Sequence, residues 1–281
     1  MKLKQKIAIG YIRVKFKLLT IVSKRLAAEK AFDLFCTPLI QTEPRTPAIF
    51  TKGEALQFEL DGLKVNGFRW NHGRPHKILI LHGFGSAAHN FHTYIAPLIT
   101  KDYEVIAFDA PAHGNSEGNK INAVQYSQMI EKVVELFGPI KGYIAHSFGG
   151  IALSLAMEKT KHHEDTHIVF IAPATETTTA IEGAFKMLKI NNAQVRKEFH
   201  KIIFERSGHP TEWFSIKRAM KNIKATVLWI HDESDDITPL ADALKVKSEN
   251  FRNIRFLITK GLGHKKIYRD NDIRKKVIDF L

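Results

Sequence analysis

Short apolar runs alternate with longer amphipathic stretches along the chain from about residue 55 onward. Six of these runs are apolar on both faces, which is typical of parallel strands that helices cover on each side. They lie at residues 78–81, 105–108, 143–145, 168–172, 227–230 and 254–258. Two earlier segments, 55–60 and 63–70, alternate more loosely and are separated by Asp61-Gly62, a turn pair that predicts an antiparallel hairpin.

The stretches between the runs have helical spacing, as in Tyr126, Ile130, Val133 and Phe137. Strands that alternate with helices predict an α/β fold, with a mostly parallel central sheet and helices on both of its faces. We assign this fold to residues 51–281.

One stretch, from about residue 175 to residue 222, interrupts the alternation. It contains no strand pattern, but two amphipathic helices can be read there, one around Phe185 and one around Phe199. We therefore predict a small helical cap that is inserted between two strands of the core.

The composition, with 281 residues of which 44% are hydrophobic and 25% charged, is that of a folded globular protein. Cys36 is the only cysteine, so no intramolecular disulfide can form. A reducing compartment is the natural environment of such a chain, and we expect a cytoplasmic protein.

The formal net charge of +13 is distributed unevenly, because eight cationic side chains and no acid precede Glu29. Residues 1–50 are predicted to form a basic N-terminal helical extension, and such a segment is attracted to acidic lipid or nucleic acid. No nucleic-acid-binding motif accompanies the charge, so we expect no nucleic-acid partner. Peripheral contact of residues 1–25 with an anionic membrane, at its inner face, is one expectation, and a merely solubilising terminus is the other. No run approaches the roughly 18 consecutive apolar residues of a transmembrane helix.

The segment from Gly142 to Gly150 combines a short strand, Ser147 and the start of a helix. This is the arrangement of a nucleophile elbow, G-x-S-x-G, whose tight turn requires small residues two positions before and after the serine. Gly149 meets this demand, and Ala145 replaces the first glycine with another small residue. Ser147 is therefore a candidate nucleophile.

A serine hydroxyl needs a base that takes its proton and a third group that orients the base. His264 follows the last strand on a loop with Gly261 and Gly263, where such a base is expected. The loop after the strand at 227–230 offers Asp235, with Asp232 as a second choice for the acid.

Two backbone N–H groups must also face the oxygen on which negative charge develops. We expect one from Phe148, directly after the serine, and one from Phe84, between Gly83 and Gly85 in the loop after an early strand.

These motifs, in this order, resemble the α/β-hydrolase superfamily over residues 55–281. The family pattern H-G-x lies at 82–84, D-x-x-G-x-G-x-S at 109–116 with Ala112 in place of a glycine, and G-x-G-H at 261–264. The acid loop, H-G-x-x-D-x-x-x-P, aligns at 231–239 and puts the carboxylate on Asp235, with Asp232 in the usual glycine position.

The resemblance implies a serine hydrolase that cleaves a carboxylic ester or thioester through a Ser-His-Asp triad and an acyl-enzyme. It implies no cofactor, and we expect neither a cofactor-binding nor a metal site. The expected partner is a small-molecule or lipid-like acyl substrate.

Two alternatives use the same residues differently. A family member without catalysis would serve only as a binding protein. A dinucleotide-binding protein would use the pattern G-x-G-x-x-A from Gly83 through Gly85 to Ala88, with Asp109 on the ribose.

The run 162–167, with His163 and His167 four residues apart, has metal-ligand residue types but is interpreted as a solvated turn.

Overall fold

The computed structural model describes residues 3–39 and 47–281, with side chains from residue 10 onward within those ranges. Residues 1–2 and 40–46, which belong to the predicted N-terminal extension, lie outside the described residues. The chain divides into two compact units. The helical unit comprises Met1–Thr37 and Glu176–Phe214, and the α/β unit comprises Pro38–Thr175 and Ser215–Leu281.

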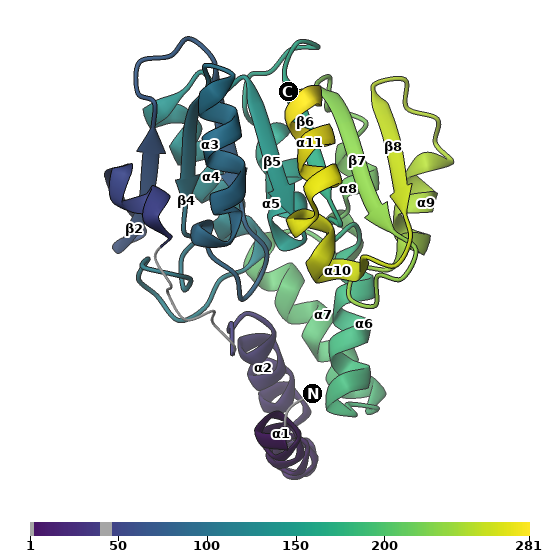
Figure 1. The fold of residues 1–281 in the computed structure, drawn as a ribbon. Helices are drawn as coiled ribbons and strands as arrows, with labels where there is room; N and C mark the ends of the chain where they lie inside the picture. Colours follow the sequence, from purple (N-terminus) through teal and green to yellow (C-terminus); the bar gives the residue numbers. More distant parts are fainter. Residues whose placement is uncertain (1–2, 40–46) are drawn as a thin grey trace. The chain divides into compact units, whose positions relative to one another are not determined.

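The α/β unit is built on one eight-stranded sheet with the order β1-β2-β4-β3-β5-β6-β7-β8 (Figure 1). β1 pairs antiparallel with β2, β2 pairs antiparallel with β4, and all other neighbours are parallel. The predicted hairpin and the predicted mostly parallel sheet are both confirmed. The strands are β1 Glu54–Leu60, β2 Leu63–Trp70, β3 Lys77–Leu81, β4 Glu104–Phe108, β5 Gly142–His146, β6 His167–Ile171, β7 Thr226–Asp232 and β8 Ile254–Thr259.

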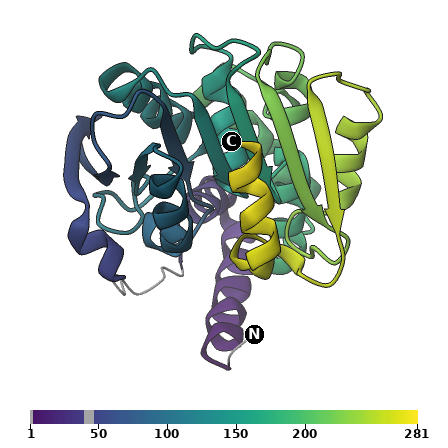
Figure 2. The ribbon, with the colours of Figure 1, turned by 45° about the horizontal axis from the view of Figure 1, so that its top comes forward.

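Each face of the sheet has its own apolar core, because successive side chains of a strand point to opposite faces. Leu79 and Leu81 of β3 belong to the same apolar cluster as residues of α4, α5, α8 and α9, whereas Ile78 and Ile80 belong to the cluster with α3 and α11. Helices cover both faces of the sheet (Figure 2). These helices are α3 His92–Thr100, α4 Ala123–Phe137, α5 Phe148–Met157, α8 Ile216–Ala219, α9 Leu240–Lys247 and α11 Asn271–Phe280. The short elements of this unit are η1 Ala48–Lys52, η2 Ala88–Phe91, α10 Gly263–Lys266 and η4 Ile267–Arg269.

The helical unit contains α1 Leu3–Val22, α2 Lys24–Phe35, α6 Thr177–Leu188, α7 Ala193–Ser207 and the short η3 Thr211–Trp213. Its core includes Phe32 of α2, Phe185 of α6 and Phe199 of α7, whose ring is 5.8 Å from that of Phe32 and 5.0 Å from that of Phe185. The two helices predicted for the cap are thus present as α6 and α7.

The division between the units differs from the one expected from the sequence, in which residues 1–50 formed a separate extension. The N-terminal helices instead pack with α6 and α7, because the buried face of α2 around Ala28 and Phe32 needs an apolar partner. Arg25 adds ion pairs to Glu198 and Glu205 of α7, at 3.4 Å and 2.5 Å. Within the described residues, no helix is long and apolar enough to cross a membrane.

Candidate active site

The candidate residues come from loops at the carboxyl ends of parallel strands of the α/β unit. Ser147 follows β5, Asp235 follows β7, His264 follows β8, and the loop with Phe84 follows β3. Because β3, β5, β7 and β8 run in the same direction, these loops lie at one edge of the sheet, where α/β proteins bind their ligands.

Ser147 occupies the sharp turn between β5 and α5, with φ 53° and ψ −118°. A non-glycine residue at positive φ is strained, and such strain is characteristic of functional turns. The turn also requires close backbone approach, since a Cβ on Gly149 would lie 2.8 Å from the carbonyl oxygen of His82. Gly83 is equally constrained, because its Cβ would lie 2.9 Å from the Cβ of Ser147. The segment therefore has the geometry of a nucleophile elbow.

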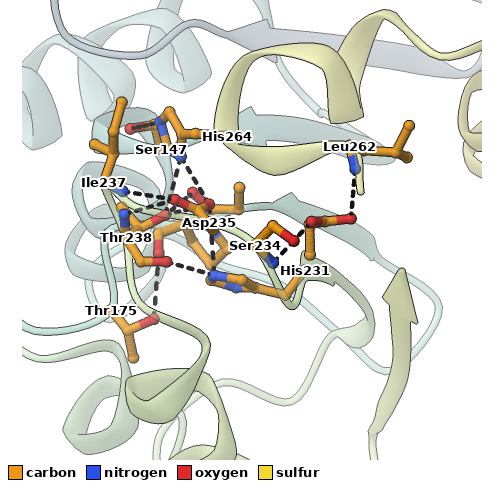
Figure 3. Close-up of polar contacts among 12 residues, drawn as sticks. Ser147, Thr175, His231, Ser234, Asp235, Ile237, Thr238, Leu262 and His264 are labelled. Atoms are coloured by element: carbon orange, nitrogen blue, oxygen red, sulfur yellow. Dashed lines mark hydrogen bonds and ion pairs between the residues drawn. The ribbon is translucent and has the colours of Figure 1, made fainter. Parts of the chain in front are cut away.

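The structure brings Ser147, His264 and Asp235 into one chain of hydrogen bonds (Figure 3). The Oγ of Ser147 lies 3.0 Å from Nε2 of His264, and Nδ1 of His264 lies 2.8 Å from Oδ2 of Asp235. All three residues are at least nine-tenths buried. With Asp235 ionised, Nδ1 carries the imidazole proton and Nε2 is free to accept the proton of the serine hydroxyl.

Asp235 is held by four donors. Its Oδ1 accepts the backbone N–H groups of Ile237 and Thr238 at 2.9 and 2.8 Å, and its Oδ2 accepts the Thr238 hydroxyl at 2.8 Å in addition to His264. Burial by itself raises the pKa of Asp235, but the hydrogen bonds from His264, Thr238 and Ile237 outweigh it and lower the pKa overall. The carboxylate therefore stays charged beside the imidazole at neutral pH.

Thr238 is a residue of the site that the sequence analysis missed. Its hydroxyl lies 3.0 Å from Nδ1 of His264 and 3.2 Å from the carbonyl oxygen of Ala172, which follows β6. The sequence offered one indication of this role. Thr238 lies three residues after Asp235, a spacing at which the two residues can form a local hydrogen bond. The contacts with Ala172 and His264 depend on the fold.

Asp232, the second choice for the acid, supports the loops instead. Its Oδ1 accepts the Ser234 amide at 2.9 Å, and its Oδ2 accepts the Thr259 hydroxyl and the Leu262 amide at 2.7 and 3.0 Å. Burial opposes ionisation of this carboxylate, but these donors prevail and lower its pKa to about 2. Asp232 thus ties the acid loop to the loop that carries His264.

Three other histidines near the elbow are buried and act as fixed hydrogen-bonding groups. His82 donates from Nδ1 to the Gly83 carbonyl and accepts the Ala110 amide at Nε2, and His113 likewise accepts the Gly85 amide. His146 lies 3.2 Å from the backbone oxygen of His264 through Nε2, while its buried Nδ1 has no hydrogen-bond partner among the described residues. Burial lowers their pKa values to about 4, 4 and 3 in chain order, so all three are neutral at pH 7.

Of the two residues expected to donate backbone amides to an oxyanion, Phe148 directly follows Ser147 and Phe84 lies in the loop after β3. Phe148 is the first residue of α5, so its N–H has no partner within the helix. The rings of Phe84 and Phe148 meet edge to face, with centroids 5.5 Å apart, so the loop after β3 packs against the start of α5.

Asp109, the ribose acid of the dinucleotide-binding alternative, has a structural role. Its carboxylate accepts the backbone N–H groups of Ala88 and Asn115 at 2.8 and 2.9 Å and is 4% exposed. Burial raises its pKa, and these two amides oppose that effect. A carboxylate engaged in this way holds two loops together and is not presented to a sugar hydroxyl.

The comparisons with known proteins agree with the fold. Residues 74–211 match the model of the hydrolase family described as serine aminopeptidase, S33. A hydrolase of uncharacterised activity from Bacillus subtilis, YugF, is 30% identical over 108 residues, 37% of this chain and 39% of that protein. A Mycoplasma pneumoniae protein that is only provisionally named an esterase/lipase is 25% identical over 114 residues, 39% of this chain. The chain spans about two-fifths of the length of these curated relatives, at 42% and 39%.

Among solved structures, an esterase from Pyrococcus furiosus superposes with a TM-score of 0.65 at 17% identity, over 88% of this chain and 97% of that one. The thioesterase domain of the curacin biosynthetic pathway superposes with a TM-score of 0.56 at 14% identity, over 81% of this chain and 98% of that one. At these identities the likeness establishes the shared fold.

Proposed function

Since the chain belongs to the α/β-hydrolase superfamily, we propose that it is a serine hydrolase that cleaves a carboxylic ester or thioester through an acyl-enzyme. One observation carries the proposal, namely the unbroken hydrogen-bond chain from Ser147 through His264 to Asp235. Ser147 is the nucleophile, His264 the general base and acid, and Asp235 the group that fixes the tautomer of His264.

In the acylation half-reaction, Ser147 Oγ attacks the carbonyl carbon of the substrate while Nε2 of His264 takes the hydroxyl proton over the 3.0 Å contact. The tetrahedral intermediate expels the alcohol or thiol, which receives that proton from Nε2. Asp235 stays ionised throughout and stabilises the imidazolium, in agreement with its lowered pKa.

In the deacylation half-reaction, a water molecule takes the place of the leaving group. Nε2 of His264 accepts a proton from the water as its oxygen attacks the acyl carbon, and then returns this proton to Ser147 Oγ as the ester bond to the enzyme breaks. The products are the carboxylic acid and the free enzyme.

The backbone N–H groups of Phe84 and Phe148 are proposed to donate to the oxyanion of both tetrahedral intermediates. The proposal is supported by the position of Phe148 at the amino terminus of α5, where unpaired N–H groups and the helix dipole favour negative charge. It is further supported by the close approach of Gly83 to Ser147, because only a glycine allows the loop to lie this near.

Labelling with a fluorophosphonate probe tests the nucleophile directly. We expect wild-type protein to be labelled at Ser147, Ser147→Ala to remain unlabelled, and hydrolysis of p-nitrophenyl acetate by this variant to fall by about 10⁴ to 10⁶. Ser154→Ala is the matched control, because this buried hydroxyl lies on α5, the helix that follows Ser147, and donates to the Ile151 carbonyl. A wild-type protein that is not labelled would favour the non-catalytic binding protein.

The acyl group and the leaving group remain to be assigned by a screen of p-nitrophenyl esters of increasing chain length beside the matching acyl-CoAs. A preference for the acyl-CoA series would identify a thioesterase and a preference for the ester series an esterase. Calorimetry with NAD(H) tests the dinucleotide alternative, and we expect no heat of binding.

A further inference from the structure

Exposed apolar side chains are concentrated on helix α1 of the helical unit. Among the described residues, eight of the thirteen large hydrophobic side chains that are exposed belong to this unit, although it is the smaller of the two. Five of the eight lie on α1 and are between 60% and 78% exposed: Tyr11, Val14, Leu18, Ile21 and Val22.

These five residues form one continuous surface, which we call the α1 stripe. Their spacing from Tyr11 is i, i+3, i+7, i+10 and i+11, which at 3.6 residues per turn covers an arc of about 100°. Phe16, on the opposite side of the helix, is only 6% exposed and anchors α1 in the unit. The guanidinium of Arg13 also donates to the Met187 carbonyl of α6. The side chains of the α1 stripe are therefore exposed, although the opposite side of α1 packs within the helical unit.

Positive charge borders the α1 stripe on both sides. By the helical spacing, Lys15 lies beside Val22 along one edge and Lys17 beside Ile21 along the other, and both lysines are exposed. No acid occurs in the sequence before Glu29, so the helix has no negative charge of its own. An apolar strip with a lysine on each side is the pattern of a helix that lies in the interface of a membrane.

We propose that the α1 stripe docks on an anionic lipid bilayer, with its apolar side chains in the boundary between headgroups and acyl chains. Lys15 and Lys17 would extend their apolar stems along the same boundary and place their ammonium groups at lipid phosphates. A second copy of the chain is a poorer occupant, because two α1 stripes face to face would bring four uncompensated lysines together. This inference does not rest on the proposed hydrolase activity.

Co-sedimentation with vesicles tests the proposal on the full chain. Vesicles of phosphatidylcholine alone are compared with vesicles that contain about one-third phosphatidylglycerol, and wild-type protein is expected to bind the anionic vesicles at least about tenfold more strongly. Val14→Glu/Leu18→Glu should weaken this binding by at least about tenfold. The matched control is Leu136→Glu/Leu244→Glu, which also replaces two exposed aliphatic side chains by glutamate, here in the α/β unit at 47% and 44% exposure, and should bind as wild type does.

A fluorescent label tests the depth of the contact. Since Cys36, the only cysteine, is buried, Leu18→Cys offers one accessible thiol for a nitrobenzoxadiazole group. Anionic vesicles should shift its emission to the blue, and the same label on Leu136→Cys should not respond.

Three outcomes would overturn the proposal. These are equal vesicle binding by the stripe variant and the control, no binding of wild-type protein to anionic vesicles, or a wild-type dimer in solution that Val14→Glu/Leu18→Glu disperses while vesicle binding is absent. The last result would assign the α1 stripe to a second copy of the chain.

Discussion

Replacing Asp235 by asparagine turns one oxygen, which accepts hydrogen bonds from His264 and Thr238, into a donor. The Oδ1 of the side chain must continue to accept the amides of Ile237 and Thr238, which lie 2.9 and 2.8 Å away. The new NH₂ group then occupies the position of Oδ2, 2.8 Å from Nδ1 of His264, and can only donate to it. His264 must therefore carry its proton on Nε2, and an Nε2–H cannot accept the proton of Ser147.

The fold should tolerate this change. The hydroxyl of Thr238, which donates to Asp235 in the wild type, also lies 3.2 Å from the Ala172 carbonyl and can turn to donate there. No buried donor is then left opposite another donor. We expect the free energy of unfolding to change by no more than about 1–2 kcal/mol, whereas kcat/KM should fall by about 10⁴, or roughly 5.5 kcal/mol of transition-state stabilisation.

The assay compares Asp235→Asn with Asp232→Asn for hydrolysis of p-nitrophenyl acetate, the rate of fluorophosphonate labelling and unfolding in urea. Asp232 accepts from Ser234, Thr259 and Leu262 but not from His264. Its asparagine variant should therefore lose stability, by about 1–3 kcal/mol, but retain activity within about tenfold of the wild type. If Asp232→Asn proves more damaging to kcat/KM, or if Asp235→Asn stays within tenfold of the wild type, the assignment of the acid is refuted.

Three further predictions concern Thr238, Gly149 and the buried histidines. Thr238→Val should lower kcat by about tenfold with little change in KM, and Thr238→Ser should restore it, because only the hydroxyl orients Asp235 and His264. Gly149→Ala should lower the free energy of unfolding by about 1–3 kcal/mol in a urea titration, since its Cβ would meet the Leu81 and His82 carbonyls at 2.9 and 2.8 Å. The buried neutral histidines have folded pKa values of about 3 to 4, below the ordinary 6.5, so the unfolded chain binds more protons and stability should fall as the pH drops from about 6.5 toward 4. His146→Gln should reduce this slope by about 1.4 kcal/mol per pH unit, and an unchanged slope in urea titrations would contradict the burial argument.

Local patterns predicted the elements of the α/β unit well. Runs such as 78–81 and 227–230 are apolar on both faces because helices cover both sides of their strands, and the structure confirms these strands as β3 and β7. Ser147, Asp235 and His264 were chosen from their motifs and their order along the chain, and the structure brings the three side chains into contact.

Long-range partners were harder to predict. The motif alignment favoured Asp235 over Asp232 as the acid. The structure was needed to show that Asp235 contacts the imidazole of His264, whereas Asp232 accepts the backbone amide of Leu262. The role of Thr238 depends on Ala172, 66 residues away. The apolar face of α2 is visible in the sequence as Ala27, Ala28, Ala31 and Phe32, yet nothing local indicates that its partner lies on α7.

The helical unit is assembled from two segments that a ribosome makes at different times. Phe32 leaves the exit tunnel long before Phe199, and at typical elongation rates the delay is roughly 10–30 s. During that interval α7 has not yet been made, so the nascent chain exposes the apolar face of α2 while most of the sheet is still being synthesised. Holdase chaperones that recognise such helices are therefore expected to engage this protein early in translation and to release it once α7 has emerged.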